Sequence, residues 1–379
     1  MRVLIFTLLS KSYEQLTQTV DSAVVRGLIE LGPRDIRRLS SLIHVPYSRA
    51  INTYKRLRRK FGLLISAAPN TELLGLTHVF FEATVRSEYR RIALRAFKGV
   101  SSLNYLAGSA TSPAELFGII YAPTGPRGDE YLELFDELVE EGFLESYTVR
   151  RFPEIVRHSL RPEYVNWSGG GGYVFDWDSL TPRPPEPGVY DPSHKPLADR
   201  LDLLLLKELE FDAAKSFPEI SAQLYSRHGV KVSDRLLLYH YEKHLVPRRM
   251  FSKYRVLFSQ AEKLGVYLVT QTAPGAYKEY LDWVRRIPYL NKELLDPSGQ
   301  HFSEYYLPSS EYQGFLGYVN SKLAPLAARM KMLVSLPNSR SMFTLPYELF
   351  DEERGEWVHD AHADASKVLA KAHELMNLA

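Results

Sequence analysis

The sequence predicts an α+β protein with an internal duplication, in which two winged helix-turn-helix domains alternate with two ferredoxin-like βαββαβ domains. The 379 residues show the same order of elements twice, and a repeated order is typical of duplicated architectures. Each half opens with apolar residues spaced three and four apart, the helical period, and continues with short apolar runs of strand character. The predicted parts are a winged helix-turn-helix domain (1–70), a ferredoxin-like domain with a C-terminal hairpin (71–180), a proline-rich linker (181–196), a second winged helix domain (197–260), and a second ferredoxin-like domain with a hairpin and a C-terminal helix (261–379).

Composition excludes several classes of function. The chain has no cysteine, which rules out disulfides, thiolate zinc sites and cysteine nucleophiles and fits a reducing cytosol. The sequence lacks a run of about 18 apolar residues, and the short apolar stretch 3–9 is not followed by a small-residue cleavage site. We therefore expect a cytoplasmic protein with no membrane partner. With a net charge of only +2, a nucleic-acid site has to be a local patch.

Each half begins with a predicted three-helix block, over 21–61 in the first half and 199–244 in the second. Ser48 and Ser233 stand at the predicted starts of the third helices, where a hydroxyl can accept a hydrogen bond from an unpaired backbone amide. Stretches of strand character follow at 63–66 and 254–258. The order of helices followed by a strand predicts a wing beside each third helix.

The second block of each half predicts two β-α-β units that share one sheet with its helices on one face. A third block predicts a hairpin in each half, at 160–176 around a glycine run and at 345–360. The expected elements of the sheets are strands 77–85, 101–106, 115–121 and 144–149 with helices 89–97 and 129–141, then strands 266–272, 289–294, 303–307 and 330–336 with helices 277–286 and 313–328.

The first third helix is the strongest candidate for DNA contact. Residues 21–62 include ten basic and three acidic residues, and such a helix can enter the major groove with its N-terminal side chains at base edges. Arg49 is suited to guanine and Asn52 to adenine, whereas the later basic side chains suit phosphates. The DNA-binding residues predicted in the first half are Arg37, Arg38, Tyr47, Ser48, Arg49, Asn52, Thr53, Lys55, Arg56, Arg58, Arg59 and Lys60.

The second three-helix block has a weaker basic surface, because residues 199–255 include eleven basic and eight acidic residues. It can contact DNA differently from the first block, or it can be a protein-contact module. The DNA-binding residues predicted in the second half are Lys231, Ser233, Arg235, Tyr239 and Lys243.

At this point the pattern resembles the Lrp/AsnC family of archaeal and bacterial transcription regulators, present in tandem. The strongest local match covers 104–108 and 115–120, where Gly108 and Glu115 occupy adjoining strands. The match extends over 21–122, and the second half matches only in element order. The resemblance implies double-stranded DNA as partner, a homodimer through the ferredoxin-like domains, a small-molecule effector and an archaeal source.

Few residues indicate chemistry. His240 and His244 have the four-residue spacing of zinc-binding pairs, but a glutamate does not follow His240 and the sequence offers no evident third ligand. The glycine run 169–172 lacks the Lys-Ser/Thr ending of a phosphate-binding loop. The acidic run 129–145 has no basic partner in its own stretch and predicts a solvated helix face. Such a face could also repel DNA or dock a basic partner. We therefore expect no metal, no cofactor and no enzymatic activity.

Three functions remain open at the level of sequence. The first is a sequence-specific transcription regulator that acts as an intrachain pseudo-dimer and reads an asymmetric site. The second is a tetrapyrrole decarboxylase-like enzyme on the same scaffold, which the charge of the first third helix disfavours. The third is a chromatin-type protein, which would bind any duplex with the same dependence of affinity on salt concentration.

Overall fold

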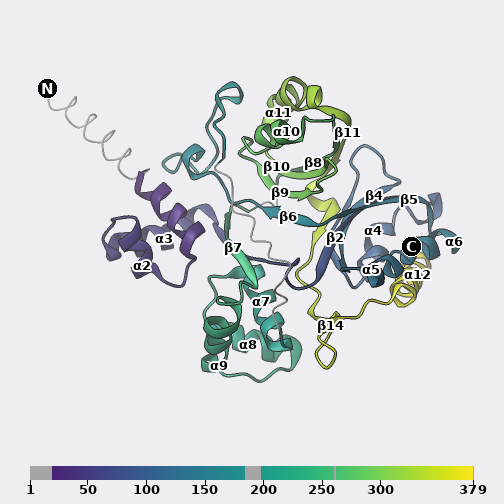
Figure 1. The fold of residues 1–379 in the computed structure, drawn as a ribbon, viewed down its shortest axis with the longest axis horizontal. Helices are drawn as coiled ribbons and strands as arrows, with labels where there is room; N and C mark the ends of the chain where they lie inside the picture. Colours follow the sequence, from purple (N-terminus) through teal and green to yellow (C-terminus); the bar gives the residue numbers. More distant parts are fainter. Residues whose placement is uncertain (1–18, 184–197, 260–261, 379) are drawn as a thin grey trace.

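The computed structural model describes residues 19–183, 198–259 and 262–378 and has an α+β fold (Figure 1). Within these residues the strands form two five-stranded sheets and two short two-stranded sheets. The α+β class predicted from the sequence is confirmed. The apolar stretch 3–9 and nearly all of the predicted linker 181–196 lie outside the described residues. Among the described helices, none combines the length and hydropathy that a membrane crossing needs.

The first helical block consists of a helix over 19–31, α2 (Ile36–Leu42) and α3 (Tyr47–Phe61). Asp35 caps α2, since its carboxylate accepts a hydrogen bond from the Arg38 amide at 2.9 Å. The predicted cap at Ser48 is wrong: α3 begins one residue earlier, directly after Pro46, and has no side-chain cap. Proline fixes its own φ near the helical value and can therefore lead the chain into a helix without a hydroxyl.

The second helical block contains α7 (Arg200–Asp212), α8 (Phe217–His228) and α9 (Asp234–His240), and α9 continues into a π-helix over Tyr241–Leu245. Here the cap prediction is confirmed, because Ser233 accepts a hydrogen bond from the Leu236 amide at 3.2 Å. Asp199 and Asp202 form a capping box at the start of α7, each side chain bonding the other residue's backbone amide.

The two predicted wings are strands, but they are not separate wings. β1 (Leu64–Pro69) pairs antiparallel with β7 (Phe251–Leu257) from the other half of the chain. Pairing satisfies the backbone groups that each strand would otherwise expose at an edge. Ile65 and Val256 are opposite one another, and both belong to a single apolar core that includes residues of both helical blocks. The sequence could not indicate that the two strands are each other's partners.

The two large sheets have the same strand order. Each contains four strands from its own half, and if these are numbered along the chain both sheets run 4-1-3-2. All eight predicted strands are present. Their bounds are β2 (Leu76–Val85), β3 (Leu103–Gly108), β4 (Glu115–Pro123) and β5 (Leu144–Phe152), and β8 (Leu264–Thr272), β9 (Leu290–Leu295), β10 (Gln300–Leu307) and β11 (Ala327–Ser335).

The fifth strand of each sheet comes from the opposite half. β6 (Glu154–Arg157) leaves the first sheet and pairs with β9, whereas β12 (Arg340–Met342) leaves the second sheet and pairs with β3. β9 and β3 would otherwise be exposed edge strands, and β6 and β12 cover these edges. This reciprocal exchange, which the sequence did not predict, joins the halves on both sides.

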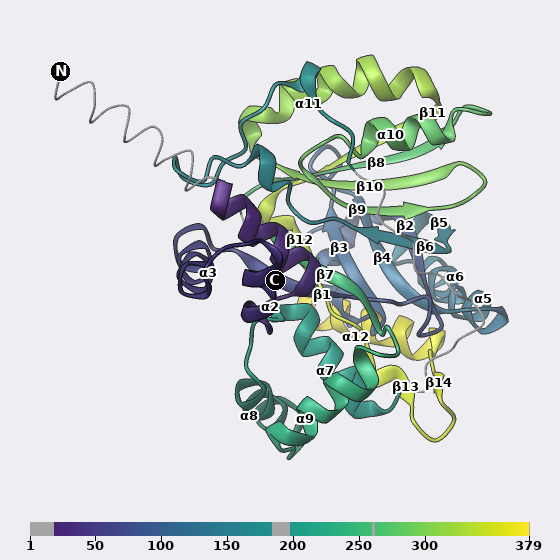
Figure 2. The same cartoon turned by 60° about the vertical axis from the view of Figure 1, so that its left-hand side comes forward.

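The sheets stack face to face between two layers of helices (Figure 2). Phe80 of the first sheet and Phe302 of the second lie 4.8 Å apart between ring centroids, and the Tyr105 and Tyr267 hydroxyls are hydrogen-bonded. The last helix, α12, returns to pack on the first sheet beside α4 and α6. The helix bounds are α4 (Ala93–Ala96), α5 (Pro126–Tyr131), α6 (Glu133–Glu140), α10 (Tyr277–Val284), α11 (Tyr312–Tyr318) and α12 (Ala361–Asn377).

Two smaller predictions need comment. The first predicted hairpin amounts to one bridge, Val165 to Tyr173, and the second to the two-residue strands β13 (Phe350–Asp351) and β14 (Glu356–Trp357). The acidic run has basic partners from outside its own stretch. Arg151 lies 2.5 Å from Asp129, and the returning α12 brings His362 to 3.0 Å from Glu137.

Candidate nucleic-acid interface and central cleft

One face of α3 is open to solvent along most of its length. Ala50, Thr53 and Leu57 are buried on the opposite face, which packs into the core shared by the helical blocks. Residues three and four apart lie on one side of a helix, so the exposed positions form a continuous stripe. We call this the α3 stripe; it consists of Ser48, Arg49, Asn52, Lys55 and Arg59.

The structure divides the predicted basic residues of α3 into two groups. Arg56 forms an ion pair with Asp21, which is fully buried, and Arg58 pairs with Asp212 of α7 at 3.0 Å. Both arginines thus hold helices together, and their contact with DNA remains a prediction. By contrast, the three basic residues of the α3 stripe form no ion pair within the described part of the chain.

Thr53, which was also predicted to contact DNA, is only 7% exposed. It follows Asn52 by one residue, a rotation that turns its side chain into the core. Arg37 and Arg38 of α2 remain exposed next to the start of α3, and the Arg37 guanidinium lies 5.8 Å from the centroid of the Tyr47 ring. Tyr47 and Lys60 are exposed as well, so the open basic surface continues beyond the α3 stripe at both ends.

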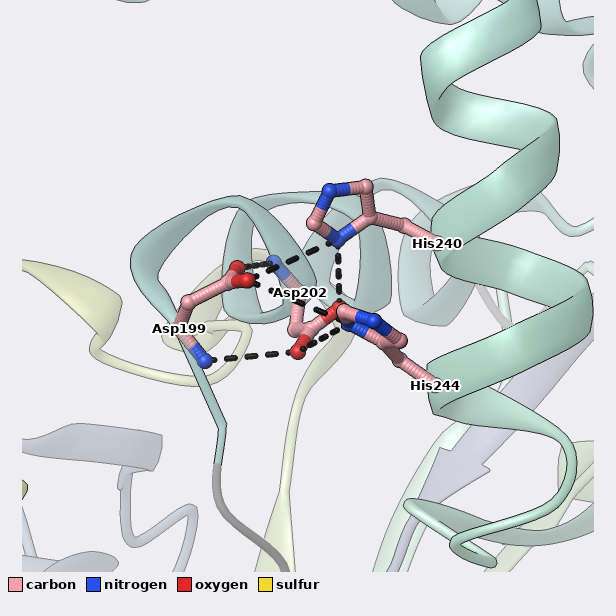
Figure 3. A group of neighbouring side chains, drawn as sticks. All are labelled: Asp199, Asp202, His240 and His244. Atoms are coloured by element: carbon pink, nitrogen blue, oxygen red, sulfur yellow. Dashed lines mark hydrogen bonds and ion pairs between the residues drawn. The ribbon is translucent and has the colours of Figure 1, made fainter.

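The second helical block presents a different surface. The five residues predicted to bind DNA there are all exposed, but the Ser233 hydroxyl is used as the helix cap. This surface also has exposed apolar side chains, with Leu236 43% exposed and Val246 47% exposed. His240 and His244 point inward, toward Asp202 at the start of α7 (Figure 3).

A cleft of about 1050 Å³ lies where the two halves meet. Its volume is at the upper end of the range of small-molecule sites. The cleft was not predicted from the sequence because its walls come from six separate stretches of chain. The lining residues are Arg26, Ile29, Glu30, Pro69, Asn70, Glu72, 153–157, 159–163, 181–183, Ser252, Lys253 and Pro297.

Buried and half-buried cations line this cleft. Arg157 is 7% exposed and donates from Nη1 to the Pro69 carbonyl at 3.0 Å, while Arg183 donates from Nη1 to the Ser159 carbonyl at 3.0 Å. The Nη2 atoms of both arginines, and Nε of Arg183, are buried without a hydrogen-bond partner among the described residues. A buried charged donor without a partner is costly, so these atoms suit an anionic group from outside the chain.

Burial also shifts the pKa values of these cations. It lowers the pKa of Arg183 to about 10, with the neighbouring Arg161 as the next contribution. It lowers the pKa of Lys253 to about 7, and Arg255 and Arg183 add to the effect. An anion bound between them would oppose each of these shifts, because an opposite charge favours the protonated form.

Behind the cleft wall lies a buried polar network centred on Glu293. His158 lies 2.7 Å and His301 3.0 Å from the Glu293 carboxylate, and Arg285 donates to it at 2.9 Å. Burial lowers the pKa of His158 to about 3, which leaves its ring neutral at pH 7. The network holds β9 and β10 against the segment that enters the cleft, so we assign it a supporting role.

The hollow at the effector position that the family resemblance implies is much smaller than the cleft. Glu115 lines a hollow of about 130 Å³ together with Glu82 and Lys331. Lys331 binds Glu82 and lies 3.9 Å from Glu115. A volume this far below about 300 Å³ is small for a ligand site.

The comparisons with known proteins concern structure alone, since neither a protein-family model nor a curated protein matches the sequence. The siroheme decarboxylase NirDL has a TM-score of 0.51 at 10% identity, over 94% of this chain and 99% of that chain. Its complex with an iron-uroporphyrin III analogue gives 0.50 at 10% identity, over 92% of this chain and 95% of that one. AsnC from E. coli is 16% identical over 37% of this chain and 92% of its own, with a TM-score of 0.28.

The two likenesses to the siroheme decarboxylase agree with the α+β fold. They also mean that the expectation of no enzymatic activity has no support, since a protein described as a decarboxylase shares the fold over nearly its whole length.

Proposed function

We propose that this protein is a double-stranded DNA-binding transcription regulator whose main contact is the α3 stripe. The observation that carries the proposal is the separation of basic residues on α3: some are used in ion pairs with the core, and the others are exposed along one face. In this proposal Arg49 donates two hydrogen bonds to guanine, and Asn52 pairs with adenine. Lys55, Arg59, Lys60, Arg37 and Arg38 contact phosphates.

We also propose that the two halves descend from one duplicated unit and act as an intrachain pseudo-dimer. The equal strand order of the two sheets and the reciprocal exchange of β6 and β12 support this. Because α3 and α9 present different side chains, the DNA site is asymmetric. The exchange covers within one chain the sheet edges through which two chains would otherwise pair.

The test compares binding to genomic fragments and to random duplexes at several salt concentrations. Arg49→Ala should weaken binding to a preferred fragment about 5- to 150-fold, as expected for the loss of a bidentate base contact worth about 1–3 kcal/mol. Arg59→Ala should weaken binding to all duplexes equally and lower the salt slope by about one. Arg95→Ala, an exposed arginine on α4 away from both helical blocks, is the control.

Two outcomes contradict this reading. Equal binding to every fragment, with the same salt slope, would indicate the chromatin-type function. If binding at physiological salt were absent, the α3 stripe would have no DNA-binding role.

A second candidate function is a binding site, or an active site, for an anionic tetrapyrrole in the central cleft. The buried nitrogens of Arg157 and Arg183 favour it, and so does the full-length fold likeness to a siroheme decarboxylase. Carboxylates of the tetrapyrrole would pair with these arginines and with Lys253. Helix 19–31 and β7 both line the cleft, so the same ligand could instead act as an effector that reaches both helical blocks.

This candidate is tested with iron-uroporphyrin III, followed by its visible absorption. Arg157→Gln should weaken binding at least about tenfold, whereas Arg329→Gln, on the remote strand β11, should leave it unchanged. Carbon dioxide release would identify an enzyme, binding without turnover would identify an effector, and equal binding by both variants would exclude the site.

A further inference from the structure

Four side chains converge at the base of the second helical block, away from both the α3 stripe and the cleft. Asp199 and Asp202 lie at the start of α7, and His240 and His244 project toward them from α9 and the π-helix (Figure 3). One ligand atom from each residue lies within 4.8 Å of the other three. We call this group the His–Asp cluster.

The distances within the His–Asp cluster fit a single small cation. Asp202 Oδ1 lies 2.7 Å from His240 Nδ1 and 3.0 Å from His244 Nδ1. Asp199 Oδ2 lies 3.7 Å from the first of these nitrogens and 3.9 Å from the second. Four ligands at ~2.0–2.1 Å from a tetrahedral Zn²⁺ ion are about 3.3 Å from one another, and the four distances lie on either side of that value.

The chemistry of the donors also fits zinc. Two imidazole nitrogens and two carboxylate oxygens form a nitrogen and oxygen set that suits Zn²⁺. Asp202 is fully buried, and the Asp199 side chain is 36% exposed, so the cluster is open to solvent on one side. An ion can therefore reach it without unfolding the block.

Hydrogen bonds within the chain account for only part of this arrangement. Both histidines can donate from Nδ1 to Asp202, and Asp199 Oδ1 caps α7 by accepting from the Asp202 amide at 2.8 Å. Asp199 Oδ2, however, accepts no hydrogen bond from the described residues, and its ion-pair partners there are those two imidazole nitrogens. Arg248 lies 3.9 Å from Asp202 Oδ2, the oxygen turned away from His240, and can stay there when Oδ1 binds a cation.

We propose that the His–Asp cluster is a structural Zn²⁺ site that fastens the start of α7 to the third helix of the second block. His240 is the last residue of α9 and His244 lies in the π-helix that follows; such local π-helical segments recur at functional positions. The ion fixes the orientation of α9 and thereby of its exposed face. The inference does not depend on DNA binding or on a ligand in the cleft.

The test uses the full chain, stripped with a chelator and then titrated with Zn²⁺ alone. We expect one tightly bound ion per chain, a higher melting temperature, and the visible absorption of four-coordinate cobalt when Co²⁺ replaces zinc. Asp199→Asn keeps a good helix cap, since Asn caps as well as Asp, but offers a poorer ligand, and should weaken zinc binding at least about tenfold. His244→Gln should do the same.

His362→Gln, a histidine variant on the distant helix α12, is the matched control and should bind zinc like the unmodified chain. The proposal is overturned if the unmodified chain binds no zinc beyond what the double variant Asp199→Asn/His244→Gln retains. It is also overturned if Co²⁺ gives only the weak absorption of six-coordinate, water-bound cobalt. Because Asp199→Asn retains the cap and is read by stoichiometry, loss of folding in the His244 variant leaves the test decisive.

Discussion

The two helical blocks have the same order of elements and different surfaces. The third helix of the first block, α3, has an exposed stripe with Arg49, Lys55 and Arg59, and its buried face packs on the shared core. The third helix of the second block, α9, is half as long, continues into a π-helix, and exposes Leu236 and Tyr239. Architecture therefore persists between the blocks while surface chemistry differs, and function has to be argued separately for each.

The two strands of the β1–β7 sheet between the blocks also differ in the chemistry of their side chains. In its register Ser66 is opposite Arg255, and Ala68 is opposite Lys253. The small side chains come from the first half and the basic ones from the second. The strand that follows the weakly basic helix thus supplies a cation to the central cleft.

The largest effect that separates the blocks is expected at two glycines that end helices. Gly32 and Gly229 both have positive φ, at +75° and +66°. A Cβ at Gly32 would meet the Tyr254 ring at 2.3 Å, whereas a Cβ at Gly229 would meet nothing within 4 Å. Gly32→Ala should cost about 2–5 kcal/mol, by adding overpacking to the backbone strain, and Gly229→Ala about 1–2 kcal/mol.

Denaturant unfolding of both variants measures these costs, with m-values compared to check that the transition keeps its size. Equal losses of unfolding free energy would mean that Tyr254, which comes from the second half, is not packed tightly against Gly32 at the end of helix 19–31. The shared core would then be less tightly packed at this point than in the structure.

An intermediate effect is expected from Lys253. Since burial lowers its pKa to about 7, the amine is neutral above that pH and charged below it. An anion in the cleft gains a charge partner only when the amine is protonated, so binding of a porphyrin carboxylate should weaken by about tenfold from pH 6 to pH 8. Lys253→Met should bind more weakly at pH 6 and lose this dependence.

The matched variant is Lys278→Met, on α10 outside the cleft, which should keep the pH profile of the unmodified chain. A profile that survives in Lys253→Met would assign the titration to another group and leave Lys253 without a role in the cleft.

Features that depend on residues close together in the chain could be predicted from the sequence, whereas features that depend on distant residues could not. Helices and strands depend on local periodicity, and eight of the ten strands in the two large sheets were predicted. Pairing between distant segments was not: nothing local shows that β1 meets β7, or that β6 and β12 exchange sheets.

The candidate sites show the same difference between local features, which could be predicted, and contacts between distant residues, which could not. The basic stripe was visible because it lies on one helix, but Arg56 and Arg58 differ from Arg59 only through partners that the fold supplies. His240 and His244 were noticed for their spacing, and their carboxylate neighbours lie about 40 positions earlier in the chain.

The smallest effect that distinguishes the blocks concerns the first turns of their third helices. Ser233 accepts a hydrogen bond from the Leu236 amide, whereas Ser48 lies inside α3, which has no side-chain cap. Ser233→Ala should therefore cost about 1 kcal/mol of unfolding free energy, the usual value of a lost cap, and Ser48→Ala less than about 0.5 kcal/mol, as for most surface changes.

Urea unfolding of the two variants under identical conditions compares their stabilities, and a DNA-binding assay compares their affinities for DNA. Ser48→Ala, on the α3 stripe, should change DNA affinity more than it changes stability, and Ser233→Ala the reverse. If the two serines exchanged these roles, α3 would start at Ser48 and its exposed stripe would be rotated away from the position that carries the DNA-binding proposal.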